Sequence, residues 1–547
     1  MLQPGETWTT RLLPHGIAGT NNATLEVSGL PPLNLEGRLG YLIQYPHGCL
    51  EQTTSAVFPQ LYLASLVRLE DSRKRQIEDN IRGGIERLRY FQLANGGFSY
   101  WPGGSGGFAT GSLEGYELWA TTYASHFLIE AEKAGYALPP SMRSGVIRHL
   151  RSTAAAWSAP RWKTSQPGAG TAADSTTRAL NRGAALDQAY RLYVLALAGS
   201  AEIGAMNRLR ELRDLPATET WLLAAAYKLA GLPDVASALT KSASMQVRDY
   251  TAPDYTFGSG LRDRAMLLHS VVTLGRFDKS SDLVRAISGE LASDNWYSTQ
   301  STAYALMAIA KFASGGSPSL FSFERRIGNE KPQIVSSAAP LYQASLTDVP
   351  AAGSPVVLRN TSQRVLFVTV ASRGVPQAGN DVAAASGLSM QLSYTDAKGK
   401  AIDISHLAQG SDLLANVTVK NLTPLRIDNI ALTEIVPAGW EIHNDRLDNA
   451  QATGEREGNE SAERVDGIPS GSREATSARA DYVDIRDDRV LQYFSLKSGE
   501  SIHFSTRLNA AYLGRYYLPS VITEAMYDAS KNARSKGQWI QVVGASH

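Results

Sequence analysis

The sequence predicts a multidomain α+β protein in which a long helical stretch is flanked by β-strands. Residues 31–320 repeat apolar side chains with the period of a helix. Residues 1–30, and the chain from about residue 320 onward, alternate apolar and polar side chains with the period of a strand. A chain of 547 residues is long enough for roughly three to four domains. Its hydrophobic fraction of 43% is enough to fill their cores.

Residues 1–30 contain two short extended runs, Thr9 to Leu13 and Ala23 to Val27, separated by glycine and asparagine. Two strands of this length do not form a stable unit alone, so we expect them to pair with strands from elsewhere. The segments after residue 320 that alternate apolar and polar side chains are candidate partner strands. Residues 1–30 and 321–385 are therefore expected to form one small β-domain, which the helices interrupt and which ends in a linker over 374–385.

The helical stretch contains many amphipathic segments of similar length with short links. The clearest has its apolar side chains on one face, at Leu186, Ala189, Tyr190, Tyr193, Val194 and Leu197. Repeated helices of this kind stack into a solenoid or close into a toroid. Residues 155–182 are rich in Ser, Thr, Ala, Gly and Pro, and we expect a surface loop there.

Residues 386–547 alternate again, with Ala415, Val417 and Val419 on one face, and turn residues separate the runs. This pattern is typical of an antiparallel β-sandwich. The polar stretch 450–480 lacks aromatic residues and is predicted to be a long loop between two strands.

Composition excludes several classes of function. The 53 Lys and Arg residues nearly balance the 52 Asp and Glu residues, so no electrostatic attraction to nucleic acid is expected. A single cysteine excludes internal disulfides and cysteine-rich zinc sites. No bilayer-spanning run and no signal peptide is visible, so we expect any targeting signal to lie upstream of this sequence. No cofactor is expected.

The one cysteine, Cys49, follows the turn Pro46-His47-Gly48 and precedes Gln52 by three residues. At this spacing the thiolate can attack the side-chain carbonyl of Gln52, expel ammonia and leave an internal thioester. We expect Pro46 and Gly48 to form a tight turn that delivers Cys49 to a helix start. Backbone N–H groups there can polarise the acyl oxygen. The alternative is that Cys49 is only a small buried apolar residue.

The stretch from Tyr45 to Ser55, YPHGCLEQTTS, resembles the thioester signature of the bacterial branch of the α2-macroglobulin and complement superfamily. Residues 92–101 resemble a turn of α/α toroids, and 295–300 are similar to the start of a late helix in thioester domains. Residues 484–489 and 512–527 resemble the last macroglobulin-like domain of that family.

The resemblance implies an arrangement of domains. A CUB-like β-domain (1–30 and 321–385) would be split around an α/α-toroid thioester domain (31–320), and a macroglobulin-like sandwich (386–547) would follow.

The resemblance also implies a function, that of a broad-spectrum protease inhibitor. After a protease cuts a bait segment, which lies outside this chain, a lysine of the protease attacks the acyl carbon of Gln52 and Cys49 is released. Cys49, Gln52 and the motif residue Glu51 would carry this single-turnover reaction, so the chain is not expected to be an enzyme. A dry thioester needs an apolar cover. We expect a hydrophobic lid whose members are Tyr45, Met526, Tyr527 and Tyr516.

The resemblance further implies a periplasmic monomer tethered to the inner membrane by an upstream lipid anchor. Target proteases would be its partners, and a peptidoglycan synthase is a further candidate neighbour.

Three alternatives remain at this point. A cysteine enzyme needs a histidine near Cys49, and His47 is the one candidate within the motif. His126 and His269 are expected to be structural, and no close histidine pair suggests a metal site. A covalent adhesin would use the same thioester on one docked target. A structural or binding module would carry an inactive thioester.

Overall fold

The computed structural model describes residues 1–44, 48–103, 114–158, 172–212, 214–250, 255–315, 320–346, 350, 353–379, 381–443 and 480–544. The chain divides into two compact units, Met1–Val375 and Pro376–His547. The division falls inside the predicted linker 374–385.

The first unit contains the helices, which lie between its first and later strands in sequence. They are α1 (Leu35–Gln44), α2 (Leu50–Val57), α3 (Leu63–Leu66), α4 (Asp71–Leu88), α5 (Glu114–Lys133), α6 (Pro140–Ala156), α7 (Ala172–Leu197), α8 (Ile203–Arg210), α9 (Ala217–Leu229), α10 (Pro233–Thr240), α11 (Gly260–Thr273), α12 (Ser281–Ala292) and α13 (Thr299–Gly315). Contacts run from α2 to α5, then to α7, α9, α11 and α13, and from α13 back to α2. These six helices therefore enclose a common interior.

Helix α7 differs from the sequence prediction in two ways. Its predicted apolar face is buried, but so is every other side chain from Ala185 to Leu197, including the ion pair between Arg191 and Asp187. The amphipathic pattern missed this because polar side chains paired with each other can also be buried. In addition, the predicted loop 155–182 is wrong at both ends, since residues 155–156 end α6 and residues 172–182 begin α7. Residues 159–171 lie outside the described residues.

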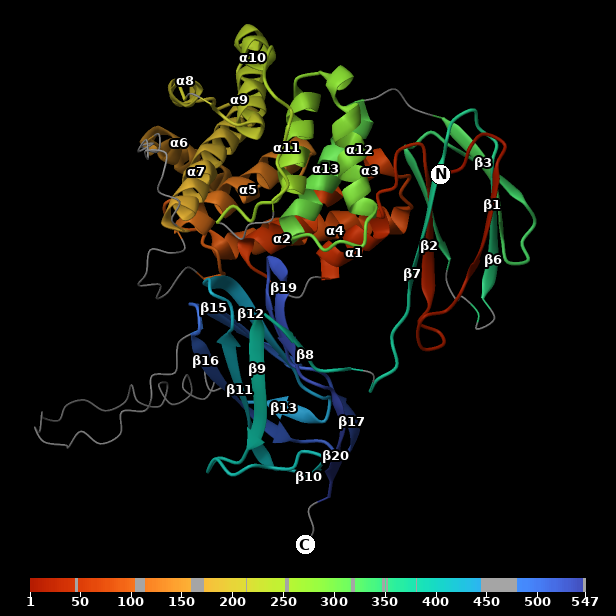
Figure 1. Cartoon of the computed structure of the whole chain (residues 1–547), viewed down its shortest axis with the longest axis vertical. Coiled ribbons are helices and arrows are strands. Elements are labelled where there is room, and N and C mark those ends of the chain that lie inside the picture. Colours follow the sequence, from red (N-terminus) through yellow and green to blue (C-terminus); the bar gives the residue numbers. More distant parts are fainter. Residues whose placement is uncertain are drawn as a thin grey trace, which may run out of the picture. The chain divides into compact units, whose positions relative to one another are not determined.

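The strands of the first unit form two antiparallel sheets (Figure 1). One has the order β1-β6-β3-β4, from β1 (Thr7–Leu12), β6 (Ser354–Asn360), β3 (Phe321–Ile327) and β4 (Gln333–Ser337). The other has the order β5-β2-β7, from β5 (Leu341–Leu346), β2 (Asn22–Ser28) and β7 (Phe367–Arg373).

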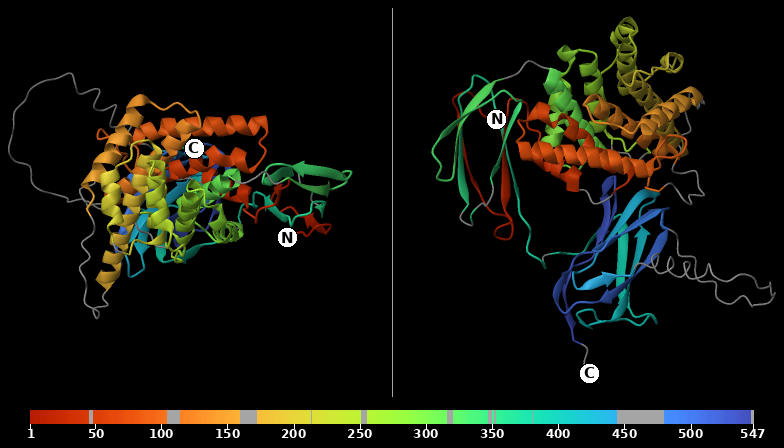
Figure 2. Two further views of the ribbon diagram at one scale, coloured as in Figure 1. Left: turned by 90° about the horizontal axis from the view of Figure 1, so that it is seen from above. Right: turned by 180° about the vertical axis from the view of Figure 1, so that it is seen from behind.

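Each sheet combines strands from before and after the helices, so the predicted pairing of residues 1–30 with later strands is confirmed. The red and green strands lie side by side in both further views (Figure 2).

The second unit consists of strands in the part of the chain that the structure describes. They are β8 (Ala384–Ser386), β9 (Leu388–Thr395), β10 (His406–Ala408), β11 (Asp412–Asn421), β12 (Ile427–Ile435), β13 (Trp440–Ile442), β14 (Tyr482–Ile485), β15 (Arg489–Leu496), β16 (Ser501–Ala510), β17 (Gly514–Leu518), β18 (Ile522–Ala525), β19 (Asp528–Arg534) and β20 (Gln538–Val543). The sheet orders are β13-β16-β11-β9, β14-β15-β12-β18-β19-β8 and β10-β20-β17. Pairing is antiparallel except between β10 and β20.

The core of this unit matches the alternation in the sequence. Ala415, Val417 and Val419 are buried as predicted. Most of the predicted loop 450–480 lies outside the described residues. Across the described parts of both units, no helix is both long and apolar enough to cross a membrane.

Candidate functional site

Cys49 occupies the N-cap of helix α2. Its backbone is extended, with φ −67° and ψ 169°, and the helix begins at Leu50. The carbonyl of Cys49 accepts the first bond of the helix from the N–H of Thr53 at 2.9 Å. The predicted helix start after Cys49 is therefore confirmed. The side chain of Cys49 is fully buried.

Gln52 is the third residue of the same helix and is only 3% exposed. An N-cap residue and the residue three positions later are the pair that interact in a capping box, where the later side chain reaches back to the helix start. Helix geometry thus favours an approach of the Gln52 side chain to Cys49. The arrangement suits formation of an acyl bond between them.

The backbone donors of this helix start are partly occupied. The N–H of Leu50 donates to the carbonyl of Tyr100 at 3.0 Å. The amide of Leu50 is therefore already engaged by another segment of the chain. The sequence-based expectation did not foresee the bond from Leu50, because it depends on a separate segment.

That segment is the turn over residues 92–101 that the sequence singled out. The N–H of Leu93 donates to the carbonyl of Gly97 at 2.8 Å, and Gly96 has a φ of +88°. A Cβ on Gly96 would lie 2.2 Å from the carbonyl oxygen of Gly145, so only glycine fits here. The tight turn brings the carbonyl of Tyr100 to helix α2.

Aromatic rings gather around Tyr100. Its ring stacks on Phe257 at 6.0 Å between centroids and meets Trp101 edge-on at 5.2 Å. Tyr116 of α5 lies 5.3 Å from Phe257. All four rings are buried. They form a buried aromatic cluster around the residue whose carbonyl bonds to the start of α2.

Glu51 is fully buried and bonds to hydroxyls of its own helix and of α13. Its Oε1 accepts a hydrogen bond from Ser55 Oγ at 2.6 Å. Thr299 Oγ1, at the first residue of α13, lies 3.1 and 3.0 Å from its two carboxylate oxygens. Tyr123 of α5 is 3.0 Å from Ser55 Oγ. Burial, and then the charge of Glu51, raise the pKa of the Tyr123 phenol well above its usual value.

The start of α13 is held in place by buried Arg262. Its Nη1 donates to Gln300 Oε1 at 3.1 Å, and Trp119 Nε1 donates to the same oxygen at 3.3 Å. The guanidinium also lies over the Trp119 ring, 4.7 Å from its centroid. These contacts fix Thr299 opposite Glu51. Residues 295–300 were recognised in the sequence, but their contact with Glu51 was not predicted.

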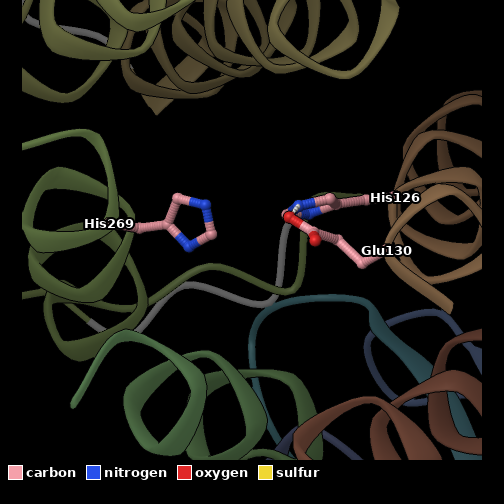
Figure 3. A group of neighbouring side chains, drawn as sticks. All are labelled: His126, Glu130 and His269. Atoms are coloured by element: carbon pink, nitrogen blue, oxygen red, sulfur yellow. Dashed lines mark ion pairs between the residues drawn. The ribbon is translucent and has the colours of Figure 1, made fainter. Parts of the chain in front are cut away.

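A second polar cluster lies inside the helices, formed by His126 and Glu130 of α5 with His269 of α11 (Figure 3). One potential ligand atom from each lies within 4.8 Å of the others, a geometry that could suit a metal ion. Lys311 of α13, however, reaches among them, with Nζ 2.7 Å from Glu130 Oε1 and 3.1 Å from His269 Nε2. Its ammonium already supplies a cation at this place, so we interpret the cluster as a buried charge network.

Both histidines of this cluster bond to tyrosines. His126 Nδ1 lies 2.9 Å from Tyr190 OH, and His269 Nε2 lies 2.7 Å from Tyr193 OH. Burial lowers the pKa of both rings, that of His269 well below its usual value. Burial alone would raise the pKa of Glu130, but nearby His126 and the bond from Lys311 hold it well below its usual value. The two rings are 5.5 Å apart, a proximity that the sequence did not predict.

The expected turn and lid residues are only partly described. Tyr45, Pro46 and His47 lie outside the described residues. Gly48 lies beside the exposed guanidinium of Arg87, since a Cβ on Gly48 would be 2.6 Å from Arg87 Nη2.

The three expected lid residues of the second unit belong to two different places. Met526 and Tyr527 are buried at the turn between β18 and β19. Tyr516 lies on β17, in a different sheet, and its hydroxyl donates to the carbonyl of Leu513 at 2.9 Å. The structure therefore brings Met526 and Tyr527 together, but Tyr516 is separated from them by sheet topology.

Comparisons with known proteins extend over nearly the whole chain. Residues 387–529 match the family model of the bacterial alpha-2-macroglobulin MG10 domain. The chain is 26% identical over 550 residues to alpha-2-macroglobulin of Escherichia coli (strain K12), covering 96% of this chain and 30% of that protein. It is 23% identical over 540 residues to alpha-2-macroglobulin of Pasteurella multocida (strain Pm70), covering 93% and 25%. The chain thus spans less than a third of these curated relatives.

Solved structures share the fold. Native alpha-2-macroglobulin from Escherichia coli, spanning domain MG7 to the C-terminus, superposes with a TM-score of 0.75 at 23% identity, covering 99% of this chain and 80% of that one. Salmonella alpha-2-macroglobulin reacted with methylamine superposes with a TM-score of 0.76 at 24% identity, covering 100% and 33%. Taken together, the domain match, the curated relatives and the shared fold show that the chain belongs to the bacterial alpha-2-macroglobulin family.

Proposed function

We propose that this chain captures attacking proteases covalently through an internal thioester between Cys49 and Gln52. The observation that carries this proposal is the position of the two residues at the N-cap and third position of α2, both buried. The structure of the Salmonella relative is of a protein reacted with methylamine, an amine that mimics a lysine side chain.

The chemistry balances in two steps. In formation, the thiol of Cys49 adds to the Gln52 carboxamide, a C–S bond replaces the C–N bond, and ammonia leaves. In capture, a lysine Nζ of the protease attacks the acyl carbon, a C–N bond replaces the C–S bond, and one proton of the amine passes to the sulfur. The protease then remains joined to residue 52 by an amide. This is a single turnover, so we propose a trap rather than an enzyme.

The finer architecture that we propose follows the family. The closed succession of contacts from α2 round to α13 supports an α/α-toroid thioester domain. The pairing of β1 and β2 with later strands supports a CUB-like domain split around it. The second unit would be the macroglobulin-like sandwich.

The cellular setting that we propose also follows the family. It is a periplasmic monomer with an anchor and a bait upstream of this sequence, and its partners would be target proteases and a peptidoglycan synthase.

Intact mass on freshly purified chain tests the thioester. We expect a mass short by one ammonia, followed by a gain of one methylamine and the appearance of one thiol on treatment. A Cys49→Ala variant should show the full mass and no methylamine uptake. A wild-type mass without the deficit, and with Cys49 already reactive as a thiol, would contradict the proposal for this chain.

The lid proposal needs its own test in the same assay. We expect Met526→Ala and Tyr45→Ala to shorten the lifetime of the thioester in water and to speed its reaction with methylamine, because each removes apolar cover. Tyr516→Ala is a control, since Tyr516 lies in a different sheet. If Met526→Ala and Tyr45→Ala leave both rates unchanged, these residues do not cover the bond.

A further inference from the structure

Glu434 carries a carboxyl group into the interior of the second unit. It lies on β12 and is only 4% exposed. The hydroxyl of Thr506, on β16 of another sheet, donates to its Oε1 at 3.1 Å. Among the residues that the structure describes, no Lys, Arg or His forms an ion pair with Glu434. In this part of the chain, a hydroxyl group and not a cation is therefore the partner of the buried carboxyl group.

Glu434 and Thr506 interrupt the apolar core of the unit. Along β16, Phe504 belongs to one buried apolar cluster and Leu508 to a second, with Thr506 between them. Along β12, Leu432 belongs to the first cluster, and Glu434 is the next residue on the same face. Side chains two positions apart on a strand share a face, so Glu434 and Thr506 meet between the two clusters. These two residues form a polar junction within an otherwise apolar interior.

A tyrosine and a surface cavity lie beside the junction. Tyr394 of β9 is opposite Ala415 of β11, which is in turn opposite Thr506. Burial, and then Glu434, raise the pKa of the Tyr394 phenol. The cavity has a volume of about 360 Å³, and its lining includes Tyr394 and the exposed Lys536. The junction therefore lies close to a space that water can enter.

The other charged side chains of the strands around Glu434 do not face it. Each is next in sequence to a residue that points into the core, so it lies on the opposite face of its strand. On β12 itself, Asp428 is at the other end of the strand and accepts a bond from Arg426. The side chains on neighbouring strands are Asp412 and Lys420 of β11, Glu441 of β13, Arg489 of β15, His503 and Arg507 of β16, and Glu524 of β18.

This environment favours the neutral form of Glu434. Burial of a carboxyl group without a cation disfavours its anion. Burial raises the pKa of Glu434 to about 7, and the bond from Thr506 opposes this rise. Ionisation would place an uncompensated negative charge between two apolar clusters.

We propose that Glu434 makes the second unit sensitive to protons: the neutral acid keeps the junction closed, and the anion drives it to open to water. The proton passes from the carboxyl group to solvent, and no other covalent bond changes. This inference concerns the second unit and does not depend on the thioester of the proposed function.

The direction of the pH dependence follows from proton linkage. In the open junction Glu434 has its ordinary pKa of 4.5, whereas in the closed junction its pKa is about 7. The open state binds fewer protons in this range, so opening becomes more favourable as pH rises from 4.5 to 7 and levels off above it. Between pH 5 and pH 7, the equilibrium constant for opening should rise by more than about tenfold.

Hydrogen exchange of the full chain, read by mass spectrometry on peptides from β12 and β16, measures this opening. These peptides separate the junction from His126 and His269 of the first unit, whose lowered pKa values give a pH dependence of opposite sign. The wild type and its variants are compared at each pH, so that the intrinsic pH dependence of amide exchange cancels.

Two variants act on the proton of Glu434 in different ways. Glu434→Gln removes the ionisable group and keeps an oxygen that accepts from Thr506. Its equilibrium constant for opening should stay the same from pH 5 to pH 7. Thr506→Val removes the bond that lowers the pKa of Glu434, so opening should continue to rise above pH 7.

A merely structural role predicts a different result. Both variants would then keep the pH profile of the wild type and differ from it by a constant factor, which would overturn the inference. Opening that does not change with pH in the wild type would overturn it as well.

Asp481→Asn is the matched control in the same unit. Burial raises the pKa of Asp481 to about 6, but this residue directly precedes β14, at one edge of its sheet. The pH profile of the β16 peptides should remain that of the wild type. A profile that Asp481→Asn flattens and Glu434→Gln leaves unchanged would overturn the role of Glu434.

If Glu434→Gln does not fold, infrared spectroscopy of the wild type and Thr506→Val decides the question. The absorption band of protonated carboxyl groups should lose intensity near pH 7 in the wild type and at a higher pH in Thr506→Val. Loss of intensity at the same pH in both proteins would overturn the inference.

Discussion

Two carboxylates inside the same helical region, Glu130 and Glu51, are buried in opposite ways. Glu130 is bonded by the ammonium of Lys311 at 2.7 Å and lies 3.7 Å from His126. Glu51 is held by the hydroxyls of Ser55 and Thr299. A cation is thus a direct partner of the first carboxylate, whereas hydroxyl groups on two helices bond to the second. The comparison teaches that a carboxylate can be buried in one helical region by an ion pair in one place and with the help of hydroxyl donors in another.

The sharpest way to break this comparison is to remove the cation from one carboxylate. Lys311→Met should lower the free energy of unfolding by about 3 kcal/mol, because it leaves Glu130 buried without its ammonium. Glu51→Gln should lower it by less than about 1 kcal/mol, since its hydrogen bonds persist. Equilibrium denaturation followed by tryptophan fluorescence measures both. The control is Lys133→Met, at the exposed last turn of α5. Equal losses in Lys311→Met and the control would contradict the distinction.

The next effect concerns the two histidines beside Glu130. Burial holds the pKa of both rings below the usual 6.5, so the unfolded chain binds protons that the folded chain does not. Stability is therefore present above pH 6.5 and is lost as pH falls below it, with a slope of up to about 1.4 kcal/mol per pH unit for each ring. Glu130, whose pKa is also lowered, adds a further loss below its ordinary value of 4.5.

Unfolding measured from pH 7 to pH 5 checks this dependence. In His269→Gln one ring can no longer gain a proton on unfolding, so the pH slope should fall by about half. Parallel slopes in the variant and the wild type would show that His269 does not titrate in this way.

A smaller effect is expected at the hydroxyl partner of Glu51. Thr299→Val keeps the shape of the side chain but removes a hydroxyl that bonds to the buried carboxyl of Glu51, which costs about 1.5 kcal/mol of unfolding free energy. Thr302→Val on the same helix is a matched control, because the buried hydroxyl of Thr302 has no hydrogen-bond partner in the described structure. If the two variants lose the same stability, the bond to Glu51 contributes nothing specific.

The smallest effect should come from an exposed charge near the same site. Arg87→Gln removes a positive charge beside Gly48, so hydroxide hydrolysis of the thioester should slow by less than about threefold and only at low salt. Arg75→Gln, near the other end of α4, should have no effect on the rate of hydrolysis. If the effect of Arg87→Gln remains at high salt, solvent ions do not screen this charge as expected for an exposed side chain.

The sequence predicted the part of the site that depends on residues close together in the chain. Cys49, Gln52 and the helix start between them follow from a spacing of three residues. Thr299 and Tyr123 could not be connected to Glu51 in this way, because separate helices bring them to it. Lys311 and His269 meet Glu130 for the same reason.

The fold shows the same limit. The helical repeat of apolar residues predicted α7, but it did not predict that the helix is buried on all sides. Polar side chains that pair with each other look exposed in a sequence pattern. The composition of residues 172–182 suggested a loop because alanine, serine and threonine do not mark a helix face. The prediction that the first strands pair with later strands was confirmed, because two short strands are not stable without partner strands.

The pairing of the first strands also has a consequence for the order of assembly. Residues 7–12 pair with residues 354–359, so the partner of β1 is synthesised roughly 340 residues later. During synthesis the first strands emerge with unpaired edges, which are prone to wrong association. The helices that separate them can fold in the meantime through contacts closer in sequence. In this protein, the two sheets of the first unit can be completed only after the helical segment between their strands has been made in full.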